Sequence, residues 1–377
     1  MKVALVHDHL AQDGGAEKVV RALAEVFPES PLYVVVYDTK RANPFFLGKD
    51  IRTSFIQHLP FGVKRYQWFL PLMPRAVESF DLSEYDVIIS SSSSLAKGVK
   101  TRADQLHICY CHTPTRFLWT EMESYVAELQ IPRWIKFILP AYLRHLRRWD
   151  RKAADRVNVF LANSTVVKDR IKTYYKREAV VIYPPLATLQ FTPASDVGEY
   201  FLAGGRLVPY KRYDLVVQTF NRLGLPLKIF GDGPMLRALE RQAEPNVTFV
   251  GRVADAELAE LYAHAQAFLN PQEEDLGITP LESMASGRPV IAYRKGGALE
   301  SMVEGETGIF FDEQSADSLT DAIRRFQSMT FDPARIRNHA EQFDVAVFKK
   351  KMKQFIEEQW NDFHHSRSFI PTRRDSG

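Results

Sequence analysis

The chain has 377 residues, 45% of them hydrophobic, and a formal net charge of +3 at pH 7. That length and apolar content are enough for two domains with separate cores, and the small net charge excludes a protein that binds polyanions with its whole surface. The apolar run at the amino terminus is too short for a secretory leader, and no run reaches the roughly 18 apolar residues of a membrane span. Cys109 and Cys111 are spaced to lie on one face of a strand, which argues against a disulfide and for a reducing, cytoplasmic setting.

Short apolar runs bounded by polar turns alternate with helical patterns through the first half of the chain. Gly14 and Gly15 open the first helix, which we expect over residues 16–27. Such alternation predicts a parallel sheet with helices on both faces. The expected strands are residues 2–8, 31–38, 85–93, 106–112 and 159–164.

The pattern pauses at residues 180–196, where prolines indicate a linker, and then starts again. Near the end, Phe348, Met352 and Ile356 recur at helical spacing and predict a last helix. The expected strands of the second half are residues 199–205, 225–232, 246–251, 265–271, 289–293 and 307–312.

The sequence therefore predicts an α/β protein with two tandem Rossmann-like, doubly wound domains that face each other across a cleft. We place the first domain at residues 1–190, the second at 191–345, a C-terminal helix at 346–365 and a flexible tail at 366–377. Ligands of doubly wound sheets bind outside the carboxyl ends of the strands. The residues just after each strand are therefore the candidates for a site.

Two segments of this kind could hold an anion. Arg206 and Lys211 follow a strand and lie five residues apart across a turn at Pro209. Together they can neutralise a diphosphate, although two solvated loop cations would have the same pattern. Gly14 and Gly15 leave backbone N–H groups at the positive end of a helix dipole, which suits a phosphate or a sugar but also fits a tight turn.

The stretch EEDLGITPLE, residues 273–282, follows another strand and holds the carboxylates Glu274 and Glu282. Thr279 and Glu282 have the spacing of a capping box with Thr279 as the N-cap, so Glu282 has a purely structural explanation. Glu274 likewise fits a solvated loop. Alternatively, both carboxylates accept hydroxyl protons of a nucleotide sugar whose phosphates lie at the helix N-terminus near Ile278.

Two common nucleotide-binding signatures are missing from the sequence. No GxxxxGK[ST] phosphate loop occurs, and GDGP at residues 231–234 lacks the glycine spacing of the dinucleotide fingerprint. Neither a P-loop enzyme nor an oxidoreductase is therefore expected.

Five segments, taken in order, resemble the retaining glycosyltransferases of family 4, which have the two-Rossmann-domain GT-B fold. They are GGAEKV, GGRLVPYKRYDL, IFGDGP, VTFVGRV, and E-DLGITPL-E followed by ASGRPVIA, and they span nearly the whole chain. The spaced glutamate pair is the most specific part. The chain departs from the family at Leu186-Ala187, where a Val-Asp pair is usual, and at Pro209-Tyr210, where an acidic residue is common before the lysine.

The resemblance implies a role for each candidate residue. Arg206 and Lys211 would bind the donor diphosphate, Glu282 the ribose and Glu274 the donor sugar. His112 falls where such enzymes place a histidine facing the transferred sugar, although it also fits a structural residue at a strand end. The implied catalytic residues are His112 and Glu274. The implied donor-binding residues are Gly15, Arg206, Lys211, Gly231, Arg252, Val253, Gly277, Ile278, Thr279 and Glu282. The C-terminal helix would cross back to the first domain.

Two basic segments of the first domain suggest a membrane surface. Residues 133–156 hold eight Lys or Arg against two Asp in an amphipathic helical pattern, and residues 55–75 interleave aromatics with cations. Such segments suit an anionic bilayer, although a packed helix with a solvated face is the alternative. The residues expected at the membrane or acceptor are Lys64, Arg65, Trp68, Arg144, Arg147, Arg148 and Arg151.

The resemblance implies a retaining, metal-independent glycosyltransferase with no cofactor besides its nucleotide-sugar co-substrate. No Asp-x-Asp metal signature occurs, and two cations can take the place of a metal at the leaving diphosphate. The segment CYCHTPTRFLW looks like that of bacterial polysaccharide mannosyltransferases, so GDP-mannose is the leading donor and a lipid-diphosphate-linked saccharide the leading acceptor. The enzyme would then lie at the inner face of the cytoplasmic membrane.

Other functions stay open at this point. A transferase of the same fold that uses a UDP-sugar would keep every assigned residue, and an epimerase or hydrolase would consume a nucleotide sugar without an acceptor. A nucleic-acid partner is not expected, because the basic residues alternate with bulky apolar ones and the site carboxylates would repel phosphates.

Overall fold

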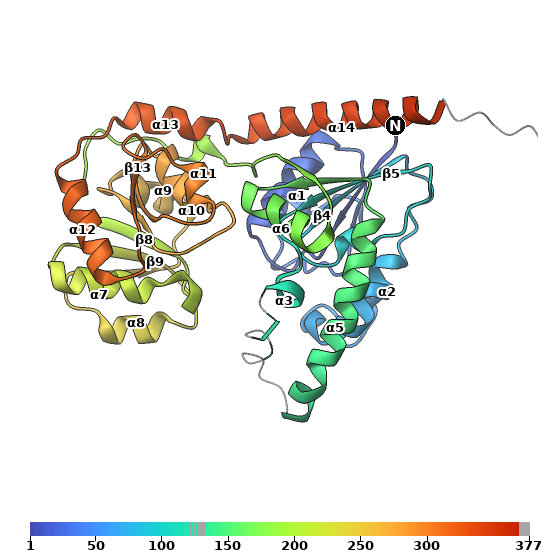
Figure 1. Ribbon diagram of the computed structural model, residues 1–377, viewed down its shortest axis with the longest axis horizontal. Coiled ribbons are helices and arrows are strands. Elements are labelled where there is room, and N and C mark those ends of the chain that lie inside the picture. Colours follow the sequence, from blue (N-terminus) through green and yellow to red (C-terminus); the bar gives the residue numbers. More distant parts are fainter. Residues whose placement is uncertain (121, 124–125, 127–132, 369–377) are drawn as a thin grey trace, which may run out of the picture. The chain divides into compact units, whose positions relative to one another are not determined.

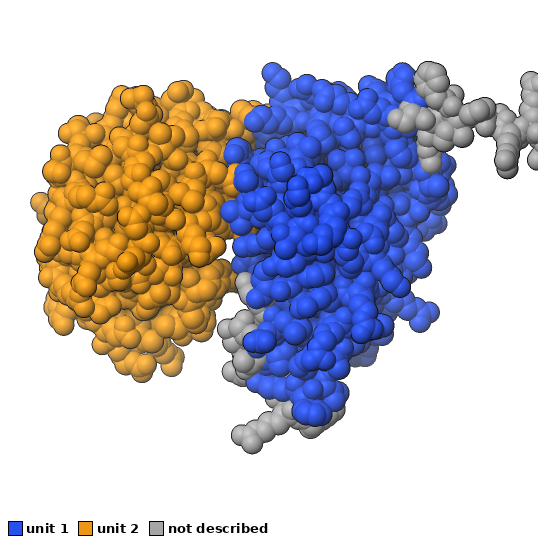
Figure 2. Space-filling model, viewed as in Figure 1, with its two compact units in different colours: residues 1–184, 348–377 blue, residues 185–347 orange. Residues whose placement is uncertain are grey.

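The computed structural model describes residues 1–120, 122–123, 126 and 133–368, and the chain divides into two compact units. Unit 1 consists of residues 1–184 together with 348–377, and unit 2 of residues 185–347 (Figure 2). Each unit has its own parallel sheet.

The sheet of unit 1 has seven strands among the described residues, in the order β3-β2-β1-β4-β5-β6-β7, and all neighbours are parallel. The strands are β1 (Val3–His7), β2 (Leu32–Val34), β3 (Ile51–Thr53), β4 (Val87–Ser92), β5 (Leu106–Cys111), β6 (Val159–Ala162) and β7 (Ala179–Val181).

The two edge strands of this sheet, β3 and β7, were not expected from the sequence. Each has only three residues, and most of them are partly or fully exposed. In the sequence β3 has Arg52 at its centre, and the apolar run that contains β7 leads directly into Pro184 and Pro185, so it was assigned to the linker. The expected linker at residues 180–196 is therefore wrong at its start, because Val180 and Val181 pair with β6.

Helices cover both faces of this sheet (Figure 1). Residues of α5 and α6 pack on one face and α1 on the other, and α14 joins α1 where Phe348 meets Tyr110 with ring centroids 5.9 Å apart. The helices, including short 3-10 turns (η), are α1 (Gly15–Val26), η1 (Pro44–Phe46), η2 (Phe55–His58), η3 (Tyr66–Leu72), α2 (Met73–Glu78), η4 (Ala96–Gly98), α3 (Arg116–Trp119), α5 (Arg133–Asp155), α6 (Thr165–Tyr175) and α14 (Val345–Ser368).

The sheet of unit 2 has six strands among the described residues, in the order β10-β9-β8-β11-β12-β13, again all parallel. Each was expected from its apolar run. The strands are β8 (Phe201–Arg206), β9 (Leu227–Asp232), β10 (Val247–Gly251), β11 (Phe268–Asn270), β12 (Val290–Tyr293) and β13 (Gly308–Phe311).

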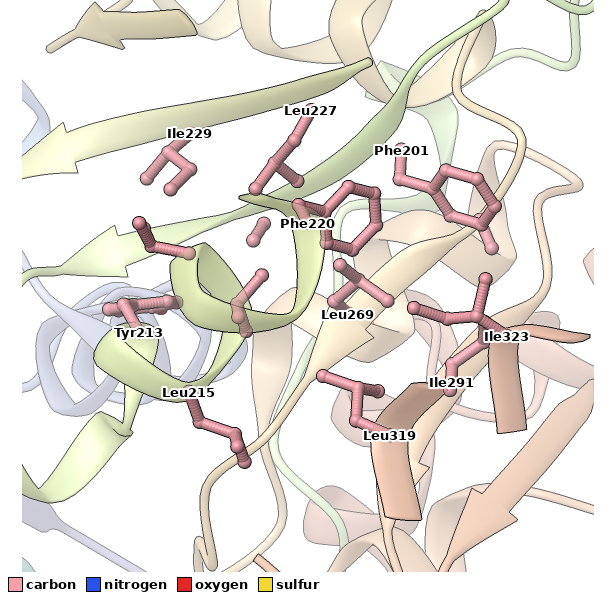
Figure 3. Packing of buried hydrophobic residues seen from close by; sticks show 14 of the residues in the cluster. Phe201, Tyr213, Leu215, Phe220, Leu227, Ile229, Leu269, Ile291, Leu319 and Ile323 are labelled. Atoms are coloured by element: carbon pink, nitrogen blue, oxygen red, sulfur yellow. The ribbon is translucent and has the colours of Figure 1, made fainter. Parts of the chain in front are cut away.

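The main core of unit 2 lies between one face of its sheet and the helices α7, α8 and α12. Figure 3 shows Phe201 and Leu227 from the strands beside Phe220 of α7 and Ile323 of α12. The helices of the unit are η5 (Thr188–Gln190), η6 (Pro209–Lys211), α7 (Tyr213–Leu223), α8 (Leu236–Gln242), α9 (Asp255–Ala263), α10 (Ile278–Ala285), α11 (Ala298–Ser301), α12 (Ala316–Gln327) and α13 (Pro333–Glu341).

Both sheets reverse their strand order once. The reversal lies between β1 and β4 in unit 1 and between β8 and β11 in unit 2. At such a switch point the neighbouring connections leave in opposite directions and open a crevice at the carboxyl ends of the strands. Each unit therefore has one favoured position for a ligand.

Candidate active site

The switch point of unit 2 brings together two of the predicted site residues. Lys211 follows β8 in the turn η6, and Glu274 follows β11. Their Nζ and Oε1 atoms are 2.9 Å apart, and their side chains are only 10% and 19% exposed. This ion pair joins the two loops that border the crevice.

Two glycines make room for this pair. A Cβ atom at Gly205, where φ is +128°, would lie 3.3 Å from the Lys211 Nζ. A Cβ at Gly277, where φ is +86°, would lie 3.3 Å from Glu274 Oε2. Both backbone angles favour glycine, so the predicted donor-binding position Gly277 is explained by the backbone as well as by space.

Arg206, the last residue of β8, is exposed. Among the described residues no carboxylate lies within ion-pair distance of its guanidinium. A fork of N–H donors at the carboxyl end of β8 is suited to bind an anionic oxygen.

Glu282 is held from within α10, but not by the expected capping box. The helix begins at Ile278 with Gly277 as its N-cap, so the prediction that Thr279 is the N-cap is wrong. Thr279 Oγ1 is buried without a hydrogen-bond partner among the described residues. The Glu282 carboxylate accepts a hydrogen bond of 3.2 Å from the hydroxyl of Tyr262, a buried residue of α9 that the sequence did not suggest.

A glycine pair after β12 supports the Glu274 loop. The N–H of Gly297 donates to the Glu274 carbonyl oxygen at 2.8 Å. A Cβ at Gly296 would lie 2.5 Å from that same oxygen, and one at Gly297 would lie 2.2 Å from the Cα of Leu276. The two loops therefore touch backbone to backbone, a contact whose only signal in the sequence is the pair of adjacent glycines.

The remaining predicted donor residues of unit 2 lie toward β9 and β10. A Cβ at Gly231 would lie 1.9 Å from the Gly205 carbonyl oxygen, so this glycine allows β8 and β9 to approach each other. Arg252, whose side chain is 83% exposed, pairs with Asp232 at 3.2 Å, and Val253 is half-buried next to it. Arg252 and Val253 thus follow the edge strand β10, with β9 between them and β8.

Unit 1 contains the predicted residues Gly15 and His112. Gly15 is the exposed first residue of α1, and the N–H of its neighbour Gly14 donates to Glu17 at 2.9 Å. His112 follows β5, and its Nε2 lies 2.8 Å from Ser91 Oγ. Both positions are at the carboxyl edge of the sheet, near the switch point between β1 and β4.

The turn after β4 is fixed by a buried carboxylate. Asp8 accepts hydrogen bonds from the backbone N–H groups of four consecutive residues and from one hydroxyl, at 2.7–3.0 Å. Burial alone would raise the pKa of Asp8, but the neighbouring histidines and these N–H groups hold its pKa below the ordinary value. The donors belong to Ser93, Ser94, Leu95 and Ala96.

Some cations of the two basic segments of unit 1 are exposed to solvent, and others contact groups within the protein. Arg144 and Arg148 are exposed on α5, whereas Arg147 stacks on the Trp119 ring at 5.2 Å and hydrogen-bonds the Leu118 carbonyl. Arg151 pairs with Asp155 at 3.3 Å. Arg147 and Arg151 therefore have structural partners that the sequence did not indicate.

Exposed apolar side chains accompany these cations. Trp68, 63% exposed, carries the Arg65 guanidinium 4.1 Å from its ring centroid, and Lys64 is exposed beside it. Phe137 of α5 is 87% exposed. Within the described residues, none of the helices is both long and apolar enough to span a bilayer.

Solved structures share this architecture over almost their full length. HepE of Anabaena, determined with UDP and glucose, superposes with a TM-score of 0.71 at 18% identity and covers 95% of this chain and 99% of that one. Sucrose-phosphate synthase of Thermosynechococcus elongatus gives a TM-score of 0.73 at 17% identity, covering 96% and 100%. Two parallel α/β units, each with a switch point, define the GT-B class of fold.

The sequence relationship identifies the family. The family model described as "Glycosyltransferase Family 4" matches residues 13–188. The family model described as "Glycosyl transferases group 1" matches residues 190–343. The chain belongs to this family of glycosyltransferases.

Two curated relatives are mannosyltransferases by name. The GDP-mannose-dependent alpha-(1-6)-phosphatidylinositol monomannoside mannosyltransferase of Mycobacterium tuberculosis is 38% identical over 136 residues, which are 31% of this chain and 35% of the relative. The O-antigen chain mannosyltransferase RfbU of Salmonella typhimurium is 26% identical over 241 residues, 59% of this chain and 65% of the relative. The chain thus matches about a third of the length of the first and under two thirds of the second.

Proposed function

We propose that the protein is a retaining, metal-independent glycosyltransferase that moves mannose from GDP-mannose to a lipid-diphosphate-linked saccharide. The observation that carries the proposal is the arrangement at the switch point of unit 2. There the exposed Arg206 ends β8, the Lys211–Glu274 pair joins the turn after β8 to the loop after β11, and the buried Glu282 lies on α10. The names of the mannosyltransferase relatives support mannose and GDP-mannose.

The chemistry assigned to the site is stabilisation of the leaving group. As the bond from the sugar to the diphosphate breaks, negative charge grows on the phosphate oxygens. Arg206 and Lys211 are cations already in place for that charge, so little reorganisation is needed when the reaction occurs. Glu274 orients Lys211 and accepts hydrogen bonds from the sugar hydroxyls. The acceptor attacks the sugar on the same face from which the leaving group departs, and the leaving phosphate takes the proton of the acceptor.

The acceptor is assigned to unit 1, with His112 facing the transferred sugar. The exposed cations Arg144 and Arg148 together with Trp68 and Phe137 favour a surface that meets anionic lipid, where a lipid-linked acceptor resides. Placement at the inner face of the bacterial cytoplasmic membrane, in surface-polysaccharide synthesis, is part of the same proposal.

The test is calorimetric binding of GDP, UDP and ADP, with and without EDTA. Wild type is compared with Arg206→Ala/Lys211→Ala and with Arg222→Ala, a matched control whose arginine pairs with Asp317 elsewhere in unit 2. We expect selective GDP binding that survives EDTA, persists in the control and is lost in the double variant. Selective UDP binding would replace GDP-mannose by a UDP-sugar, and no binding at all would overturn the diphosphate site.

An epimerase or hydrolase remains the rival activity at the same site. Such an enzyme would consume the nucleotide sugar at the same rate with and without a lipid-linked saccharide. The proposed transferase releases GDP faster when the acceptor is present.

A further inference from the structure

Three strand ends of unit 1 meet at one buried residue, Ser91 of β4. Its hydroxyl oxygen lies 2.8 Å from Nε2 of His112, which follows β5. Its carbonyl oxygen accepts a hydrogen bond of 2.9 Å from Nδ1 of His7, the last residue of β1. Ser91 therefore contacts both neighbouring strands at the switch point.

The contacts continue from His7 to the start of α1. Nε2 of His7 and Oε1 of Glu17 are 3.8 Å apart, an ion-pair distance rather than a hydrogen bond, and both residues are almost fully buried, at 1% and 2% exposure. The Glu17 carboxylate also accepts the Gly14 N–H. A chain of polar contacts thus runs from the Gly14–Gly15 turn through Glu17, His7 and Ser91 to His112.

The backbone of His112 is already fixed by other groups. Its N–H donates to the Ser92 carbonyl at 2.9 Å, and its carbonyl oxygen accepts from the Asn163 side chain at 3.0 Å. Those bonds do not determine the rotation of the imidazole about its side-chain torsions. The ring packs edge-on against Tyr110, with centroids 5.3 Å apart, and Ser91 binds one of its nitrogens.

We propose that Ser91 is a positioning residue that fixes the imidazole of His112 for the transfer step. The inference rests on the proposed function, in which His112 faces the transferred sugar. A hydrogen bond to one ring nitrogen selects the rotation of a histidine about its side-chain torsions, whether the serine hydroxyl donates to that nitrogen or accepts from it. His7 binds the Ser91 carbonyl and is itself paired with Glu17, so the backbone that carries the Ser91 hydroxyl is held in place.

The same strand provides a matched comparison. Ser90 is also buried, and its hydroxyl lies 2.8 Å from Nε2 of another histidine, His107, near the start of β5. Successive residues of a strand point to opposite faces, so Ser90 and Ser91 serve different faces of the sheet. Loss of either hydroxyl removes the same atom and the same kind of contact, but only Ser91 contacts His112.

The experiment compares Ser91→Ala with Ser90→Ala in the full chain by two readouts. The first is NMR of the histidine ring nitrogens in ¹⁵N-histidine-labelled protein. We expect Ser91→Ala to shift the ring signals of His112 and Ser90→Ala to shift those of His107. Unchanged His112 signals in Ser91→Ala would overturn the proposal, and this readout needs no enzymatic activity.

The second readout is steady-state transfer from GDP-mannose to a lipid-linked acceptor. We expect kcat of Ser91→Ala to fall about ten- to a hundredfold, the effect of a misplaced group, while calorimetric affinity for GDP and kcat of Ser90→Ala stay near wild type. Equal kcat in the two variants would overturn the role of Ser91. If wild type transfers no sugar at all, the proposed function fails while the ring signals still decide whether Ser91 orients His112.

A more conservative variant keeps the test decisive if Ser91→Ala does not fold. Ser91→Cys keeps a side chain of similar shape but offers only a weak hydrogen bond. It is expected to shift the His112 signals and lower kcat in the same direction. Wild-type behaviour of Ser91→Cys in both readouts would contradict the proposal.

Discussion

At the scale of single residues, a tyrosine determines how Glu282 can act. Burial and the negative charge of Glu282 raise the pKa of Tyr262 well above its ordinary value, so its hydroxyl remains a donor to the carboxylate. One carboxylate oxygen is thereby anchored in the protein. In the proposed function, a carboxylate held in this way contacts the ribose with little reorganisation.

We predict that Tyr262→Phe lowers the free energy of unfolding by about 1–3 kcal/mol, because a buried carboxylate loses a partner, and that it also weakens nucleotide binding. Denaturant unfolding and calorimetry measure the two effects. Tyr200→Phe is the control, since Tyr200 donates to the Leu261 carbonyl at 2.9 Å in the same unit but does not contact Glu282. Equal nucleotide affinity in the two variants would contradict the assigned role.

The His7–Glu17 pair gives unit 1 a dependence on pH. Burial alone would lower the pKa of His7, but its interaction with Glu17, with smaller contributions from Asp8 and the Ser91 carbonyl, holds that pKa above 6.5. The same pair lowers the pKa of Glu17 despite its burial. His9, also nearby, has its pKa lowered mainly by burial.

The sign of the effect follows from the direction of the His7 shift. A histidine whose folded-state pKa is raised contributes its full stabilisation below pH 6.5, and this contribution is lost as the pH rises through the folded-state pKa. We therefore predict that the stability of wild type relative to His7→Gln decreases as the pH rises above 6.5. Thermal unfolding across this range measures it, and a difference that grows with pH would disprove the assignment.

At the scale of elements, the loop after β12 supports the loop after β11. Gly296 has a φ of +65° and approaches the Glu274 carbonyl, whereas Gly305 has a similar φ of +81° and nothing within 4 Å of a Cβ. Both Gly→Ala variants strain the backbone, but only Gly296→Ala adds a collision with the site loop. We predict that Gly296→Ala weakens nucleotide binding and lowers stability by about 1–3 kcal/mol beyond Gly305→Ala. Calorimetry and denaturant unfolding of the two variants distinguish the effect of backbone strain, which both have, from that of the collision with the Glu274 loop.

A second set of elements is joined by a fully buried ion pair. Lys97 of η4 and Asp150 of α5 are 2.5 Å apart, and Asp150 also accepts from Thr115, Trp119 and Tyr175. The pair thus ties η4, α3, α5 and α6 together beside the segment that carries His112.

Removing one partner leaves a buried charge unpaired, so we predict that Lys97→Met lowers the free energy of unfolding by about 3–5 kcal/mol. The double variant Lys97→Met/Asp150→Asn should recover part of that loss, because neither charge then remains. A double-mutant cycle in denaturant checks this. Strictly additive losses would mean that the two charges do not stabilise each other.

Some secondary-structure elements were predicted correctly from the sequence, and others were not. Strands β4 and β5 were expected from the sequence and are buried along their whole length. The three-residue edge strands were missed, because β3 has a charged residue, Arg52, at its centre and the apolar residues of β7 lead into the prolines of the expected linker. The cap of α10 was misassigned because Gly277 and Thr279 are both capping residues, and only the backbone angle of Gly277 decides between them.

The candidate site shows the same division. Residues at or just after strand ends, such as Arg206, Lys211 and Glu274, could be proposed from the sequence because ligands of doubly wound sheets bind at the carboxyl ends of strands. Other contacts of the candidate site were not expected: Tyr262 binds Glu282 and Ser91 binds His112, and both Tyr262 and Ser91 occupy buried positions outside the predicted motifs. These contacts form only when the sheet folds, so no local spacing of residues in the sequence predicts them.

At the scale of the whole molecule, the surface that we propose to face lipid belongs to unit 1. The hydroxyl of Tyr142 in α5 bonds the Leu70 carbonyl of η3 at 3.4 Å, so the two basic segments are packed together. We predict that Arg144→Glu/Arg148→Glu weakens binding to phosphatidylglycerol vesicles by about 2 kcal/mol or more, roughly thirtyfold, at about 1 kcal/mol per lost cation.

Vesicle co-sedimentation measures this binding, and it should weaken further in high salt. The control is Arg222→Glu/Arg241→Glu in unit 2, which removes the same charge from a surface not assigned to lipid. Equal losses in both double variants would mean that only the total charge matters.

The two units also differ in how the chain builds them. Unit 2 is one uninterrupted stretch, but unit 1 is completed only by residues from 348 onward, including Phe348 against Tyr110. During synthesis on the ribosome, the sheet of unit 1 is made first but cannot be fully covered until α14 has been made. Unit 2 can therefore fold before unit 1 is complete. A message truncated just after unit 2 would yield a nascent chain with one finished core and one uncovered face, a natural substrate for chaperones and proteases.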